Sequence, residues 1–283
     1  MGNMAGPTVR RSQLGKALRQ LREDARVSRP DAAAAIRCST SRMAHVEGGR
    51  NVLGYTELIV LARDLYGVDA AMLATLEELR AEASTRGWWS QYGLPDWLAG
   101  YIGLEHDAES VRCLELELIP GLLQTEQYAR MLYTLRGHLS TKEMDRRVAA
   151  RMQRQDRLVG ANPLQLIAIV SEAALYRCAR YAPVAAAQLQ QLADRALWPN
   201  VELRVLPFDL GLHVGMSGPF SLLSFPELLL DDAAYQEYAV GGHVIEDGSI
   251  VSQLDTLFNK LRSQTLGDDE SLALIAEFVR HIN

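Results

Sequence analysis

The sequence is poor in cysteine and has no long apolar run. Three of its 283 residues are cysteines and none lies in a Cys-x-x-Cys pair, so the sequence predicts neither a disulfide framework nor a metal site. No apolar stretch approaches the roughly 18 to 20 residues that cross a bilayer, and residues 1–7 lack the apolar core of a signal peptide. We therefore expect a cytoplasmic protein with no membrane partner and no cofactor.

The usual sequence signatures of catalysis are also missing. Residues 215–218 place a serine among glycines, but without the spacing of a nucleophile elbow. The chain contains neither a P-loop nor a G-x-G-x-x-G run, and its six histidines are scattered. We therefore expect no catalytic residues and no enzymatic activity. An enzyme that uses the loop Gly211–Gly218 is a remote alternative.

The charge of the chain is unevenly distributed. The formal net charge is −6, which on its own argues against nucleic acid. Residues 8–50, however, contain ten arginines and lysines and four acidic residues, so this segment carries +6 and the remainder carries −12. A basic head on an acidic body localises the attraction for phosphate to one end of the chain.

Apolar periodicity and capping residues predict a mainly α domain of five helices over residues 8–83. Leucines and alanines recur every three or four positions in the first helix, as in an amphipathic helix. Ser28 and Ser39 are suitable N-caps for a second and a third helix, and Gly48-Gly49 ends the third. The outer helices are expected at 8–25, 56–66 and 69–83.

The pattern changes after residue 100 and predicts a mixed α/β domain over 84–283. Val111–Ile119 alternates leucine with glutamate, the period of a half-buried strand. Leu164–Val170 is a continuous apolar run, which suits a buried strand. The strands are expected at 111–119, 164–170, 201–206, 220–225 and 235–240, and the helices at 125–135, 141–159, 183–197, 249–261 and 269–281.

The segment from Val27 to Arg50 resembles the helix-turn-helix of the phage-repressor family (XRE, or Cro and C1, type). The resemblance rests on Val27-Ser28, Ala32-Ala33, Ile36, Ser39, Met43, Val46-Glu47 and Gly49-Arg50. In this family small residues let two helices cross tightly, and the helix after the turn enters the major groove. The resemblance implies a transcription regulator that binds double-stranded DNA at the nucleoid and acts as a homodimer.

The same resemblance indicates which residues meet DNA: Arg29, Arg37, Ser39, Thr40, Ser41, Arg42, His45 and Arg50. Arg42 is the best candidate for reading guanine, because its fork can bond O6 and N7 together. Arg29, Arg37 and Arg50 are expected to hold phosphates. Arg29 stands where the family often has glutamine, and Arg37 where its turn often has glycine, so relatives do not define the base preference.

The second domain resembles that of actinobacterial regulators in which this type of head is fused to a carboxyl-terminal domain called Scr1-like or antitoxin-like (the DUF5753 type). The resemblance rests on Trp97-x3-Tyr101-x3-Glu105, Ile119-Pro-Gly-Leu-Leu-Gln-Thr-Glu-x-Tyr-Ala129, Arg151-x2-Arg-Gln155, Ser171-Glu172-x2-Leu175 and Val205-Leu-Pro207. It implies a small partner protein. Pro120–Thr125 is either a leucine-filled corner capped by Gln124 and Thr125, or part of a sensing site.

Two hypotheses follow from these observations. The first is a dimeric DNA-binding regulator whose second domain receives a signal from a small molecule or a protein. It is motivated by the basic helix-turn-helix joined to an acidic mixed domain. The second is an antitoxin-like protein that chiefly sequesters a small partner protein, with DNA binding secondary. It is motivated by the family resemblance and by the charge of −12 outside residues 8–50.

Overall fold

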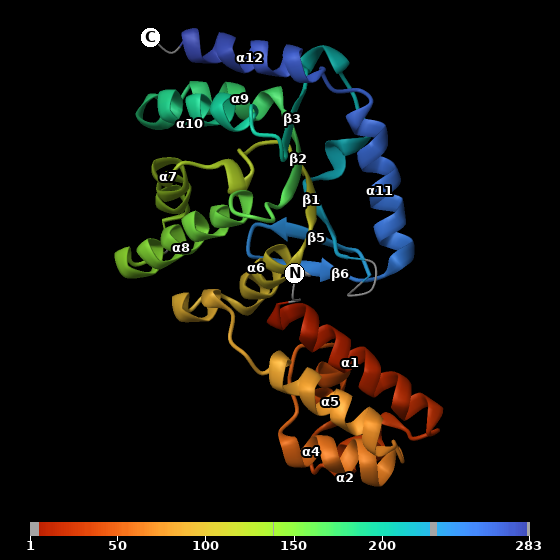
Figure 1. Ribbon diagram of the computed structural model, residues 1–283. Coiled ribbons are helices and arrows are strands. Elements are labelled where there is room, and N and C mark those ends of the chain that lie inside the picture. Colours follow the sequence, from red (N-terminus) through yellow and green to blue (C-terminus); the bar gives the residue numbers. More distant parts are fainter. Residues whose placement is uncertain (1–5, 138, 227–230, 282–283) are drawn as a thin grey trace. The chain divides into compact units, whose positions relative to one another are not determined.

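The computed structural model describes residues 6–137, 139–226 and 231–281, and it divides the chain into two compact units (Figure 1). The first runs through Ser90 and the second begins at Gln91, whereas the sequence placed the boundary after residue 83. The first unit is built from helices and the second combines helices with a six-stranded sheet. The predicted fold class, a mainly α helix-turn-helix domain followed by a mixed α/β domain, is confirmed.

The first unit contains the five predicted helices. They are α1 (Pro7–Asp24), α2 (Arg29–Ala35), α3 (Thr40–Glu47), α4 (Tyr55–Ile59), which continues as a π-helical segment (Val60–Leu65), and α5 (Ala70–Ala83). The first unit ends within the 3₁₀ turn that comes next in the chain (Trp88–Tyr92). Ser28 Oγ accepts the Asp31 N–H at 3.2 Å and thereby caps α2. Gly49, at φ +69°, takes the left-handed conformation that follows α3.

Small and apolar side chains form the core of the first unit. Ala32 and Ala33 of α2 are buried together with Met43 and Val46 of α3. Gly15 of α1 approaches α3 so closely that an added Cβ would lie 2.6 Å from the Val46 carbonyl oxygen. The close approach of α1 to the end of α3 therefore depends on a residue without a side chain.

The second unit is arranged around the sheet. Its elements are α6 (Asp96–Asp107), β1 (Ser110–Glu115), α7 (Glu126–Arg136), α8 (Thr141–Arg154), β2 (Gln165–Ser171), α9 (Glu172–Ala179), α10 (Ala182–Arg195), β3 (Val201–Leu206), β4 (Phe220–Ser224), β5 (Ala233–Tyr238), β6 (Gly241–Ile245), α11 (Gly248–Arg262) and α12 (Asp268–Arg280). The strand order is β3-β2-β1-β4-β5-β6. The first three strands pair in parallel, and β4, β5 and β6 pair antiparallel.

Helices lie on both faces of this sheet (Figure 1). On one side α11 packs its Phe258 and Leu261 against Leu114 and Leu222 of the strands. On the other side lie α6, α7 and α8. Because side chains alternate along a strand, β1 sends Leu114 toward α11 and its neighbour Glu115 toward the opposite side.

Three elements were not predicted, and two strand boundaries were wrong. Helix α6 is buried on several sides, so its sequence shows no single apolar stripe. Helix α9 begins directly after β2, where Ser171 caps it. Strand β6 opens with two glycines, which have low strand propensity. β1 ends at Glu115 instead of Ile119, and β5 ends at Tyr238 instead of Val240.

Candidate functional site

The start of α3 presents hydroxyl groups on the surface of the first unit. Ser39, Thr40 and Ser41 are all exposed. Ser39 Oγ accepts the Arg42 N–H at 3.1 Å, which caps the helix as predicted. Within the described residues, no hydrogen bond joins the hydroxyl of Thr40 or Ser41 to another protein group. Both side chains are therefore free to bond a base edge or a phosphate.

Two exposed arginines flank α3 in the sequence, Arg37 before it and Arg50 after it. Neither side chain has an ion pair or hydrogen bond in the part of the chain that the structure describes. Arg37 has φ +54°, a left-handed conformation that glycine adopts more readily. This explains why a glycine suits this turn and shows that the chain holds an arginine there despite the conformational cost. The geometry supports the assignment of both side chains to phosphates, which stays a prediction.

Arg42 is engaged within the protein. Its two terminal nitrogens donate to the two carboxylate oxygens of Glu57, at 2.6 Å and 2.9 Å. The hydrogen bond to this carboxylate raises the pKa of Arg42, and the same contact lowers the pKa of Glu57. These are the nitrogens with which Arg42 is expected to read guanine. Base reading by Arg42, which stays a prediction, therefore requires that its fork leave Glu57.

A buried ion-pair cluster joins the first three helices. Glu47, at the end of α3, accepts the Arg22 Nε–H at 2.5 Å and the Arg29 Nε–H at 2.9 Å. Arg22 and Glu47 are both buried, whereas Arg29 is partly exposed. The terminal nitrogens of Arg29 have no partner among the described residues, so they remain available for the predicted phosphate contact. His45 is half-buried on α3.

The sequence did not identify Arg22 or Glu57 as partners. Arg22 follows Leu14 and Leu18 at intervals of four, which places an arginine on the apolar stripe of α1. Such a position signals a buried charge that needs a partner. Glu57 carries no comparable signal, because its contact with Arg42 depends on how α3 and α4 pack.

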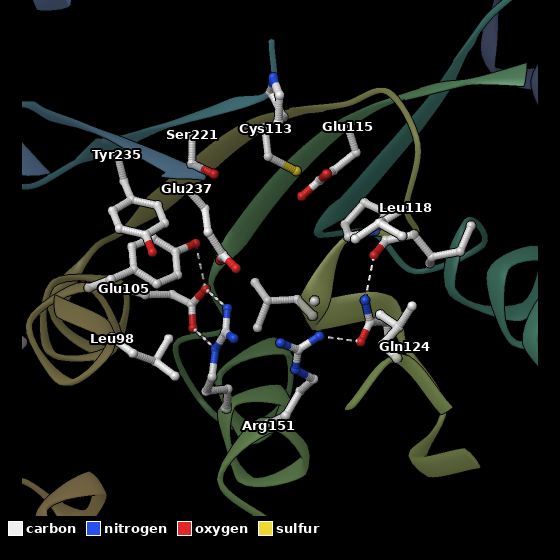
Figure 2. A pocket seen from close by; sticks show the side chains of 18 of the residues that line it. Leu98, Glu105, Cys113, Glu115, Leu118, Gln124, Arg151, Ser221, Tyr235 and Glu237 are labelled. Carbon is white, nitrogen blue, oxygen red and sulfur yellow. Dashed lines mark hydrogen bonds and ion pairs between the residues drawn. The ribbon is translucent and has the colours of Figure 1, made fainter. Parts of the chain in front are cut away.

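The second unit contains a cavity of about 440 Å³ between the sheet and helices α6, α7 and α8 (Figure 2). Strand register builds one wall. Cys113, Ser221 and Tyr235 are aligned across β1, β4 and β5, and all three line the cavity. Glu115 and Glu237 lie two residues further along β1 and β5, so they face the same space. Figure 2 shows both carboxyl groups directed into it.

Helix α8 supplies two arginines to the opposite wall, three residues apart. Arg154 donates to both carboxylate oxygens of Glu105 on α6, each at 2.7 Å, and both residues are buried. The Tyr101 hydroxyl donates to the same carboxylate at 3.0 Å. This charge pair is therefore complete without a ligand.

Arg151 and Glu115 are not matched in this way. Arg151 donates to Gln124 Oε1 at 2.5 Å and to the Tyr133 hydroxyl at 3.1 Å, but its buried Nε has no partner. No carboxylate of the described residues lies within ion-pair distance of Arg151. The Glu115 carboxyl has neither a hydrogen bond nor an ion pair in this part of the chain. Burial, and secondarily the charge of Glu237, raises the pKa of Glu115 to about 8.

The corner Pro120–Thr125 is leucine-filled and capped, as the first of its two predicted roles requires, and its part in a sensing site stays a prediction. Thr125 caps α7 by accepting the Tyr128 N–H at 3.2 Å, and Leu122 and Leu123 are buried. Gln124 donates to the Ile119 carbonyl at 2.7 Å while it accepts from Arg151. Pro120, Leu122 and Gln124 line the cavity. The corner is a structural element that also forms part of the cavity wall.

The remaining sequence features have simpler environments. Cys113 and Cys178 are buried free thiols, and burial raises the pKa of each. Over residues 6–137, 139–226 and 231–281, no three His, Cys, Asp or Glu side chains gather as they would around a metal ion. Within the same ranges, every helix is too short or too polar to cross a bilayer.

Comparison with known families matches both units. Residues 13–76 match a family model described as a helix-turn-helix domain, and residues 98–277 match one described as a domain of unknown function (DUF5753). No curated protein and no solved structure matches the chain. The predicted arrangement, a helix-turn-helix followed by a DUF5753 domain, is confirmed.

Proposed function

Because the chain belongs to the DUF5753 family and carries a helix-turn-helix domain ahead of that region, we propose that it is a sequence-specific transcription regulator whose second unit receives a signal. The helix-turn-helix domain makes it a DNA-binding protein. The assignment of the helix-turn-helix to the XRE type, the homodimer and the signal-receiving role belong to the proposal.

The surface around α3 carries this proposal. Thr40 and Ser41 are exposed where a recognition helix meets base edges, and the unpaired Arg37 and Arg50 flank the helix in the sequence. Cations without protein partners lose no ion pair when they bind phosphate, so their full attraction contributes to DNA affinity. The net charge of +6 over residues 8–50 also attracts phosphate and so favours DNA binding.

The second unit supports a binding role. Its cavity has a size within the range of small-molecule sites, roughly 300 to 1,000 Å³, and contains polar groups without protein partners. Binding rather than catalysis is the proposed role of this unit. A ligand there can regulate DNA binding only if the DNA-bound and free forms of the protein differ in their affinity for it.

Selection of DNA duplexes from a random pool by the purified full-length chain tests the regulator. We expect enrichment of one motif in two copies related by a twofold axis, because a homodimer places two recognition helices one DNA turn or more apart. The double variant T40A/S41A tests base reading, with R19Q, on the exposed face of α1, as the control. Failure to enrich any motif, or an unchanged motif with T40A/S41A, would overturn the assignment of this surface.

A second candidate function is the sequestering of a small partner protein. The loop between β3 and β4 exposes Phe208, Leu212 and Met216, and Leu212 is 89% exposed. Exposed apolar side chains that cluster in one loop are typical of protein interfaces. Purification from the native host separates the two functions: a stoichiometric partner that the variant L212S/M216S loses supports sequestration, and its absence from the wild-type preparation contradicts it.

A further inference from the structure

The cavity of the second unit combines one unmatched cation with apolar walls. Of the three arginines that line it, Arg154 is paired with Glu105, and Arg136 with Glu237 at 3.3 Å. Arg151 has no carboxylate partner among the described residues. Arg151 is partly buried, and a cation withdrawn from water without a counter-ion is unfavourable, so the cavity beside it favours one negative charge.

The apolar side chains that line the cavity indicate that the body of the ligand is apolar. Leu98 of α6, Leu118 after β1, and Leu132 and Leu135 of α7 all line the cavity. Leu135 is 70% exposed and Leu118 is 38% exposed. An apolar molecule that enters the cavity covers these exposed apolar side chains. This burial favours binding by about 25 cal/mol for each Å² of apolar surface removed from water.

Resting on the signal-receiving role proposed above, we propose that this cavity binds a small amphipathic carboxylate whose acid group pairs with Arg151 and whose apolar body lies against the leucines of α6 and α7. Each terminal nitrogen of Arg151 carries a second N–H beside the one that it donates to Gln124 or Tyr133, and these N–H groups can donate to the ligand's carboxylate. A single unmatched guanidinium suits a monoanion; a phosphate dianion would need a second free cation.

The protonation state of Glu115 distinguishes an anionic ligand from a cationic one. The groups whose charges act on its carboxyl are Glu237 on β5 and Arg151 and Arg154 on α8, and Cys113 is its neighbour on the same face of β1. A carboxyl that stays protonated at neutral pH can donate a hydrogen bond to a bound carboxylate. An ammonium ligand would instead favour the ionised form of Glu115. The two ligand classes therefore predict opposite pH dependence.

The test uses probes that share a skeleton and differ in charge: octanoate, octanamide and octylamine, and 4-phenylbutanoate with its amide and amine. Binding to the full-length chain is measured by calorimetry and by thermal shift at pH 7. We expect at least one carboxylate to bind at least tenfold more tightly than its amide and its amine. Equal or tighter binding of the amides or amines, or no binding by either carboxylate, would overturn the proposal.

Variants locate the site. R151M is expected to weaken carboxylate binding at least tenfold, whereas R177M, which removes an exposed arginine outside the cavity, leaves it unchanged. Because R151M can also disturb folding, E115Q provides an independent readout. Affinity for the carboxylate should fall up to about tenfold between pH 7 and pH 9 in the parent and stay level in E115Q. Binding that rises with pH, or that R151M leaves unchanged, would contradict the site.

The ligand site and the signal-receiving role are tested separately by measuring affinity for the selected DNA with and without the bound carboxylate. A shift in DNA affinity that R151M abolishes supports both. Carboxylate binding without any change in DNA affinity supports the site and overturns the signalling role for this ligand. A protein that binds its selected DNA but no carboxylate overturns the site and leaves the DNA-binding function standing.

Discussion

Each unit of this protein buries a bidentate arginine–glutamate pair between helices, but the two pairs have different surroundings. In the first unit, Glu47 accepts from Arg22 and Arg29 within a packed helical core. In the second, Glu105 and Arg154 lie in the wall of a cavity, beside Arg151 and Glu115, which have no ionic partners among the described residues. Buried charges that are matched hold helices together, whereas ionisable groups left without a partner beside a cavity indicate a binding site.

Loss of the matched carboxylate in the first unit should have the largest effect. Glu47→Gln removes the buried counter-ion of Arg22 and leaves it only the exposed carboxylate of Glu23, so we expect a loss of about 3–5 kcal/mol in the free energy of unfolding. Hydrogen exchange of α1 and α3 measures the loss within this unit. The control Glu23→Gln, at an exposed partner of Arg22, should change the free energy of unfolding by less than about 1 kcal/mol. Similar hydrogen exchange in Glu47→Gln and Glu23→Gln would show that the buried ion pair stabilises this unit no more than the exposed one.

The unmatched Glu115 should affect stability in a pH-dependent way. Its pKa is raised in the folded protein to about 8 from an ordinary 4.5, so its protonation favours the folded state. This contribution is complete below pH 4.5 and is lost as the pH rises to 8. Glu115→Gln should therefore nearly match the parent at pH 4.5 and exceed it by about 4 kcal/mol at pH 9.

Denaturant unfolding of both proteins across this pH range measures the difference. Glu117→Gln, two residues further along the chain at an exposed position, is the control and should show no such divergence. If the difference between Glu115→Gln and the parent is the same at both pH values, Glu115 is not held in its protonated form by the cavity.

In the first unit, the ion pair of Arg42 with Glu57 allows a test of whether a matched arginine also reads DNA. Arg42→Ala should weaken specific binding by about 1–3 kcal/mol and relax preference at one base pair if the fork reads guanine. Glu57→Gln frees the fork and should retain that preference. Affinity for the selected site and its single-base variants measures both effects. An unchanged base preference in Arg42→Ala assigns Arg42 to the α3–α4 contact alone.

The smallest effect is expected at Arg37. Replacing it by glycine relieves a left-handed conformation, which should raise the free energy of unfolding by about 0.5–1 kcal/mol. If Arg37 holds one phosphate, the slope of log affinity against log salt should become about 0.9 less negative. DNA titrations at several salt concentrations measure the slope. Arg280→Gly, in the last turn of α12, is the control, and an unchanged slope in Arg37→Gly contradicts the phosphate contact.

Much of the fold could be predicted because its signals are local. Ser28, Ser39 and Thr125 cap helices through hydrogen bonds that span only three residues, so the sequence identifies each helix start. Elements without a local signal were missed. Helix α6 is buried on several sides and has no polar face, and β6 depends on pairing with β5 for its existence.

The residues of the candidate sites also divide into those that local signals in the sequence predict and those that they do not. Thr40 and Ser41 could be placed at the start of α3 from the sequence, because the N-cap Ser39 determines where that helix begins. The engagement of Arg42 by Glu57 could not, because 15 residues separate the partners. The cavity draws on β1, β4, β5 and three helices. Its composition depends on strand register, which no local pattern in those segments reveals.

Composition, periodicity and capping residues were sufficient to establish two domains, a basic helix-turn-helix and a mixed α/β partner, since these features depend on neighbours along the chain. Which charges meet is a property of packing. The chain contains 29 basic and 35 acidic residues, and their order does not reveal that Glu47 is enclosed while Arg151 stays unmatched. Only the tertiary structure brings α8 opposite β1 and β5, and it thereby makes the corner Pro120–Thr125 part of a cavity wall.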